Sequence, residues 1–218
     1  MSQGPALEGP SSDVTATDGA GRFLAAPDRF ARDDGAPDLR IREAGSVAAL
    51  MAALSDGRLL VALVASGPEA TVGEEKSSEM SVVSMVAADG RKGLLVFSGV
   101  DALHMWDPGA RPVPVAGKDA AQAALEQECE AMIIDVAGPR RQVLTEADVV
   151  TLAGVNPLEF AQPIAQRGLD AALGPGRALV EVDQECLRVH APGEEPGDVA
   201  AAISTRVLAL TAVEIVAE

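Results

Sequence analysis

Two apolar runs joined by Asp89-Gly90 constrain the fold of this chain more than any other feature. They form the stretch SEMSVVSMVAADGRKGLLVF at residues 78–97. Glycine supplies the positive φ that a tight primed turn needs, so an Asp-Gly pair between apolar runs predicts a β-hairpin. We therefore expect two antiparallel strands, near residues 79–88 and 92–97.

Local signals predict the remaining elements. Ser46 can cap a helix that stops at Gly57, and the run RLLVALVA at 58–65 is apolar on both faces, which predicts a central strand. Further helices are expected at 118–130, after Thr145, after Asn156 and at 196–208, and further strands at 131–137, 178–183, 186–190 and 212–218. The fold class is thus α/β (α+β): a mixed sheet flanked by helices, with a small C-terminal ββαβ module.

Composition divides the chain into three parts. Residues 1–44 are rich in Gly, Pro, Ser and Asp and poor in apolar side chains, which predicts a mobile N-terminal arm. Residues 45–168 form the main lobe. The Gly-Pro-rich joint LGPGR then introduces residues 169–218, a module too small to bury much core alone, so we expect it to pack on the main lobe.

Charge and composition exclude several classes of partner. The net charge of -16 repels phosphate backbones, and aromatic residues make up only 2% of the chain, so direct nucleic-acid binding is not expected. The sequence has no signal-peptide pattern and no apolar run long enough for a membrane span, which predicts a cytoplasmic protein. The acidic surface either steers a partner with a basic surface or serves only solubility.

The residue types of enzymes and metal sites are sparse. Cys129 and Cys186 are far apart in sequence, which favours reduced thiols. Cys186 and His190 share one face of a predicted strand but would lie ~13 Å apart, too far to ligate one metal. No nucleophile elbow, Walker loop or dinucleotide fingerprint occurs. We expect no cofactor and no metal, and the balance favours a protein without catalytic activity.

Four segments occur in order along the chain: FARDDGAPD, KSSEMSVVSM, VFSGVDALHMWDPGARPVPV and AMIIDVAGP. Through them, residues 58–154 resemble the N-terminal domain of the SseB-like family, bacterial proteins named for enhanced serine sensitivity, and its actinobacterial branch in particular. Residues 169–218 resemble a shortened form of the second domain of some members.

The resemblance implies a cytosolic α/β protein without an established reaction, with serine tolerance suggested for some members. Ser98-Gly99 departs from the Thr-Ser of many relatives, so any role of a hydroxyl at position 99 would be absent here. An unrelated secretion translocator has a similar name, but this chain lacks the sustained heptads of a coiled coil.

Two carboxylates and one histidine form a candidate cleft. Asp101 and His104 are one helical turn apart and could do acid–base work, or Ser98 and Asp101 form a capping box and His104 is partly buried. Asp135 ends an apolar strand, where open sheets bind ligands, or it forms a turn before Gly138-Pro139. In this alternative function the protein is a small-molecule sensor or an enzyme of amino-acid metabolism.

We favour a non-catalytic adaptor over that alternative. Its candidate contact face comprises Glu74, Glu75, Lys76, Glu79, Met80, Trp106 and Arg111. Trp and Arg are frequent interface anchors, and Arg111 is held in a stiff segment beside Pro112, where it could pair with a carboxylate inside or outside the protein. A third possibility is a homo-oligomer assembled through an acidic helix or the last strand.

Overall fold

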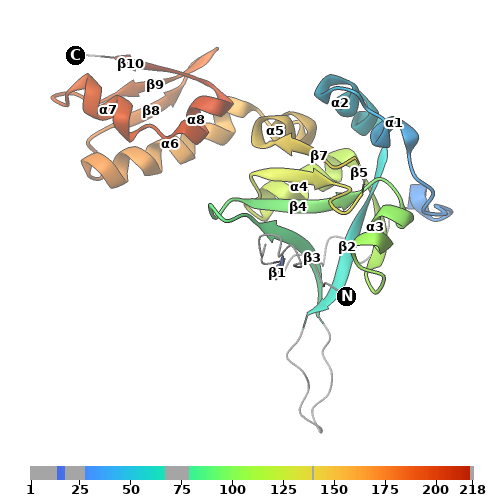
Figure 1. Cartoon of the computed structure of the whole chain (residues 1–218). Coiled ribbons are helices and arrows are strands. Elements are labelled where there is room, and N and C mark those ends of the chain that lie inside the picture. Colours follow the sequence, from blue (N-terminus) through green and yellow to red (C-terminus); the bar gives the residue numbers. More distant parts are fainter. Residues whose placement is uncertain (1–13, 18–27, 67–78, 139, 217–218) are drawn as a thin grey trace, which may run out of the picture. The chain divides into compact units, whose positions relative to one another are not determined.

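Figure 1 shows the computed structural model of the chain, which describes residues 14–17, 28–66, 79–138 and 140–216. The chain forms two compact units, Met1–Thr145 and Glu146–Glu218. The boundary precedes the one expected after residue 168, because two helices, α5 (Glu146–Ala153) and α6 (Pro157–Leu173), pack with each other and with later elements. No helix in the described part of the chain has the length and apolar composition of a bilayer span.

The larger unit is a mixed sheet with helices around it, as the sequence predicts. The seven strands in its described residues are β1 (Val14–Thr17), β2 (Arg58–Ser66), β3 (Glu79–Val86), β4 (Lys92–Phe97), β5 (Arg111–Ala116), β6 (Ala131–Ile134) and β7 (Gln142–Thr145). Its helices are η2 (Asp28–Phe30), α1 (Leu39–Arg42), α2 (Val47–Asp56), α3 (Val100–Trp106) and α4 (Gly117–Glu126). The sequence patterns did not indicate β1, β5 or β7.

β2 is central in this sheet, as its two apolar faces predict. One edge pairs antiparallel with β5, and the other pairs with β4 near the start of β2 and with β3 near its end. Leu60 and Ala62 pack in a cluster with α3, and the alternating Leu59 and Leu63 are equally buried on the opposite face. β4 pairs parallel with β6, which pairs antiparallel with β7.

The hairpin of β3 and β4 confirms the prediction from Asp89-Gly90, but its turn has another geometry. The Gly90 N–H donates to the Ala87 carbonyl at 2.9 Å, and the Ala87 N–H donates to the Arg91 carbonyl at 2.8 Å. Gly90 has a φ of +86°, whereas Asp89 stays outside the left-handed region. The loop therefore spans residues 88–90 and needs a positive φ only at the glycine.

Part of the expected arm is anchored on the larger unit. The Arg58 guanidinium in β2 donates from Nε to the Asp33 carboxylate at 2.7 Å and from Nη2 to the Ala36 carbonyl at 2.6 Å. The Arg58 and Asp33 side chains are only 11% and 16% exposed. This ion pair is shielded from solvent and fixes the segment. The polar composition of the segment did not predict such a contact. Residues 1–13 and 18–27 of the expected arm lie outside the described residues.

The smaller unit contains the expected ββαβ module together with α5 and α6. Its elements are β8 (Leu179–Val182), β9 (Cys186–His190), α7 (Pro196–Ala202), α8 (Thr205–Leu210) and β10 (Ala212–Val216). β9 pairs antiparallel with β8 and parallel with β10. Instead of one helix at 196–208 there are two, because Ser204 caps α8 anew. α6 supplies Ala161, Ala165 and Leu169 to the core of this unit.

Gly99 lies where the anchored segment meets the start of α3. The Val100 N–H donates to the Gly35 carbonyl at 2.8 Å, which brings the two backbones into contact. A Cβ at Gly99 would lie 2.7 Å from the Cα of Pro37. Real Cβ atoms essentially never come so close to backbone, so position 99 accepts only glycine without a backbone shift.

We expect Gly99→Ala to lower the free energy of unfolding by about 1–3 kcal/mol, because the added methyl group overpacks against Pro37. Urea denaturation followed by circular dichroism measures the change. Gly45→Ala is the matched control: its Cβ would meet nothing within 4 Å, so its effect should stay within about 1 kcal/mol. Equal effects of the two substitutions would show that the contact with Pro37 does not constrain position 99.

Candidate functional site

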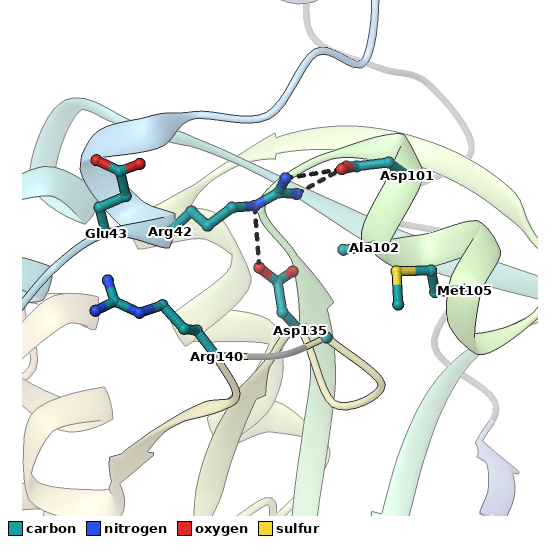
Figure 2. A pocket seen from close by; sticks show the side chains of 8 residues that line it. Arg42, Glu43, Asp101, Ala102, Met105, Asp135 and Arg140 are labelled. Carbon is teal, nitrogen blue, oxygen red and sulfur yellow. Dashed lines mark hydrogen bonds and ion pairs between the residues drawn. The ribbon is translucent and has the colours of Figure 1, made fainter.

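A pocket of about 460 Å³ lies among three parts of the larger unit: the end of α1, the helix α3 and the loop between β6 and β7. Figure 2 shows its lining residues, Arg42, Glu43, Asp101, Ala102, Met105, Asp135, Gly138 and Arg140. The structure thus brings together Asp101 and Asp135, two members of the candidate cleft. The third, His104, is exposed on α3 and does not line the pocket.

Asp135 is the buried acid of the pocket. It directly follows β6 with a φ of +52° and is 3% exposed. One carboxylate oxygen accepts from the Ser98 N–H at 2.8 Å, and the other accepts from the Ser98 hydroxyl at 2.6 Å. Its carbonyl accepts from the Gly138 N–H at 2.8 Å. Asp135 therefore both forms a turn and ties the end of β6 to the end of β4.

Arg42 crosses the pocket from α1 to α3. Its two terminal nitrogens each donate to one oxygen of Asp101 at 2.7 Å, a bidentate pair, and its Nε donates to the Ser98 hydroxyl at 3.1 Å. The hydrogen bond from Arg42 holds the pKa of Asp101 below its ordinary value, and the same bond raises the pKa of Arg42. Both groups therefore stay charged and paired at neutral pH.

The predicted capping box at Ser98 is wrong. The N-cap of α3 is Gly99, which has no side chain to cap with, and the Ser98 hydroxyl donates to Asp135 instead. Asp101 faces Arg42 rather than the helix start as a box partner. Because the Ser-x-x-Asp spacing is local, it could not reveal that two residues distant in sequence, Arg42 and Asp135, engage both side chains.

Asp101 and His104 are not arranged as an acid–base pair. Both oxygens of Asp101 accept hydrogen bonds from Arg42, so this carboxylate is held away from proton transfer. His104 is exposed to solvent in the last turn of α3. The geometry therefore gives His104 no acid–base partner in the pocket.

The candidate contact face is only partly within the described residues. Glu74, Glu75 and Lys76 lie outside them, while Glu79 and Met80 begin β3. Arg111 is exposed at the start of β5. Trp106 is half-buried at the end of α3, with its ring centroid 5.7 Å from that of Phe97.

Sequence reasoning missed two arginines of the pocket. Arg42 falls in the segment expected to be mobile, and Arg140 follows a predicted turn. Nothing in the spacing of either arginine relates it to residue 101 or 135. The two acids were the best sequence indication of the arginines, because a buried acid such as Asp135 needs hydrogen-bond donors near it.

The described residues hold no group of three His, Cys, Asp or Glu side chains that could bind a metal ion. Burial raises the pKa of the Cys129 thiol to about 11, so this thiol stays protonated at neutral pH. Cys129 and Cys186 are both free, and they belong to different units. Cys129 therefore acts as a buried apolar side chain.

Ser98→Ala should destabilise the protein by about 1–3 kcal/mol, because one oxygen of the buried Asp135 carboxylate loses its donor. Chemical denaturation at neutral pH checks this. Ser55→Ala is the control, since the Ser55 hydroxyl donates to the Ala52 carbonyl on an exposed part of α2; its cost should stay within about 0.5 kcal/mol. A Ser98→Ala protein as stable as the parent would contradict a structural role of this hydrogen bond.

Asp101→Asn should destabilise the protein in a pH-dependent way. The pKa of Asp101 is lowered in the folded state, so its stabilising effect is present above the ordinary value of about 3.9 and is lost as pH falls through the folded value. Because the Asp101 side chain is 53% exposed, we expect a loss of at most about 1 kcal/mol at pH 7.

Denaturation of the parent and of Asp101→Asn between pH 7 and about pH 3 measures this difference. Arg42→Gln should lose the same pH-dependent part, and the double variant should lose no more than the larger single effect. A difference that stays constant down to the lowest pH would show that the ion pair with Arg42 contributes nothing.

Comparisons with known proteins give one match. Residues 40–151, just over half of the chain, match the SseB protein N-terminal domain. The match spans α1 to most of α5 and so includes every residue that lines the pocket. Neither the curated proteins nor the solved structures contain a significant match to the chain. The chain therefore belongs to the SseB family.

Proposed function

We propose that this SseB-family protein is a non-catalytic cytoplasmic interaction or adaptor protein whose partner carries a basic surface. Its contact face consists of Glu74, Glu75, Lys76, Glu79, Met80, Trp106 and Arg111. The observation that carries the proposal is the strand register at the end of β2, which brings the starts of β3 and β5 to one end of the sheet.

The register supports a continuous contact face. In β2, Ala65 lies opposite Met80 of β3, and two positions earlier Leu63 lies opposite Arg111 of β5. Ser66, at the end of β2, lies opposite Glu79 at the start of β3. The starts of β3 and β5, which are far apart in the sequence, therefore lie at the same end of β2, where one partner could touch both.

Prolines in β5 favour recognition through side chains. Pro112 and Pro114 have no N–H, so the ladder to β2 can take donors from β5 only at residues 111, 113 and 115. The two prolines then face the outer edge, which can donate no hydrogen bond at those positions. Such an edge resists the addition of a foreign strand, and the exposed Arg111 at its start is left as the recognition element.

The state of the acids supports a role without catalysis. Asp101 and Asp135 each accept hydrogen bonds at both carboxylate oxygens, from Arg42 and Ser98 respectively. A general base accepts a proton from a substrate, whereas these hydrogen bonds of both carboxylates are to groups of this protein. These two carboxylates instead hold helices and strands in place.

The charge of the chain defines the partner. A net charge of -16 attracts basic surfaces over a distance of about one Debye length and speeds their encounter, with an effect that weakens as salt rises. Specificity then depends on side chains of the contact face, because long-range charge alone does not select one basic protein among many.

The test is affinity purification of partners from native lysate, at low and at physiological salt, with mass spectrometry of the retained proteins. We expect one stoichiometric basic protein whose recovery falls with salt, and at least about a tenfold loss with Arg111→Glu, since interface anchors contribute about 2 kcal/mol or more. Trp106→Ala should have a similar effect.

Arg167→Glu is the matched control, because Arg167 is exposed on α6 in the other unit and the charge change is the same. This variant should keep the partner. If folded Arg111→Glu and Trp106→Ala proteins retain every partner of the parent, the contact face is wrong. A bait that recovers no protein at low salt would contradict the adaptor function itself.

A further inference from the structure

We infer that the pocket between α1, α3 and the β6–β7 loop binds a small molecule that has a carboxylate group and an apolar body. This goes beyond the proposed contact with a protein, because none of the residues that line the pocket belongs to the contact face. The volume of about 460 Å³ falls within the range of roughly 300–1,000 Å³ that small-molecule sites occupy.

Arg140 is the group that would hold the carboxylate. It is exposed on the β6–β7 loop, and among the residues drawn in Figure 2 no hydrogen bond or ion pair reaches it. Its planar guanidinium offers five N–H donors in a fork that matches a carboxylate. Arg42 and Arg58 each face an acid of this protein, whereas no acid among the residues that line the pocket pairs with Arg140 in the described part of the chain. The Arg140 guanidinium can therefore bind a ligand.

Arg42 adds a second source of donors. Three of its five N–H groups donate to Asp101 and Ser98, which leaves two that can reach a ligand. Its position is fixed by those bonds and by the burial of Ile41, whose carbonyl accepts from the Gln142 side chain at 2.7 Å. A guanidinium held in place before the ligand arrives loses little conformational entropy on binding.

The two acids that face the pocket do not occupy Arg140. Asp101 forms the bidentate pair with Arg42, and Asp135 accepts from Ser98 at both oxygens while its Oδ2 lies 3.8 Å from the Arg42 Nε, so both acids are engaged on the far side of the pocket from Arg140. Glu43 is the remaining carboxylate of the lining, and it is exposed. Water screens its repulsion of an anion, so Glu43 weakens the binding of a carboxylate without preventing it.

The apolar part of the ligand would lie on α3. Figure 2 shows Met105 and Ala102 on the side of the pocket opposite Arg140. The Met105 side chain is 60% exposed although it lines a pocket. A methionine of this kind is flexible and polarizable, so it can adapt to an apolar group and be covered by it. The arrangement of one cationic wall and one apolar wall suits a carboxylate with a short branched chain.

The test uses the full chain labelled with ¹³C at its methionine methyl groups, titrated with 4-methylpentanoate. We expect the Met105 methyl signal to shift with a dissociation constant near about 1 mM, a typical affinity for so small a ligand. Acetate, which lacks the apolar body, and 4-methylpentanamide, which lacks the charge, should each bind at least about tenfold more weakly.

Three variants locate the carboxylate. Arg140→Gln should weaken 4-methylpentanoate at least about tenfold, whereas Glu43→Gln should tighten it by up to about threefold because a nearby negative charge is removed. Arg141→Gln is the control: Arg141 is an exposed neighbour that does not line the pocket, so its effect should stay within about twofold. Unchanged methyl spectra without ligand verify that each variant is folded.

The inference is overturned if the Met105 signal does not move at about 10 mM probe, if the amide binds as tightly as the carboxylate, or if Arg140→Gln binds like the parent. Its failure is distinct from failure of the adaptor function. Arg140→Gln should retain the protein partner in the affinity purification, and Arg111→Glu should retain the probe.

Discussion

Ser98 is the residue through which the candidate site is assembled. Its N–H and its hydroxyl donate to the two oxygens of Asp135, its hydroxyl accepts from Arg42, and its carbonyl accepts from Arg58 and from the Asp38 N–H. One fully buried residue thus ties the end of β4 to β6, to α1 and to the segment before α1. Because a buried polar group is costly without a partner, each of these bonds supports the others.

Two arginines hold the segment around Asp33 and the helix α1 in place in this acidic chain. The Arg58–Asp33 and Arg42–Asp101 pairs link residues 25 and 59 positions apart, and the guanidinium of Arg58 also donates to two backbone carbonyls. A planar group with five donors can satisfy several acceptors at once, which lysine cannot do in the same geometry. Because Arg42 and Arg58 form ion pairs inside the protein, exposed arginines such as Arg111 and Arg140 are the better candidates to bind a partner or a ligand.

The sequence predicts those parts of the fold that depend on local signals. Gly90 marks the hairpin, Ser46 caps α2 through the N–H of Ala49, and the unbroken apolar run of β2 marks a strand paired on both edges. Each of these signals operates within a few residues, and each is strong because only one backbone conformation satisfies it.

What the sequence could not give are contacts between distant residues. The segment before α1 is polar, and it is held in place by the complementary charge of Arg58 and by backbone hydrogen bonds to Ser98 and Val100, all distant in sequence. Ser98 and Asp101 have the spacing of a capping box, but tertiary hydrogen bonds from Arg42 and to Asp135 compete successfully with that local arrangement. β7 was not predicted because it is short and Leu144 is its only buried side chain. For the candidate site, the two acids were identifiable and the two arginines were not.

The helix α3 connects the two proposed binding regions. Asp101, Ala102 and Met105 line the pocket, and Trp106, the next residue, packs on Phe97 and belongs to the contact face. A ligand at Met105 would change the affinity of a partner at Trp106 only if α3 could adopt two placements and the ligand bound one of them more tightly. By linkage, such a ligand would change the affinity of the partner by the same factor as the partner changes the affinity of the ligand. α3 has only seven residues and is tied at its start to Arg42 through Asp101, so the two regions meet at its other end, where Met105 and Trp106 are adjacent.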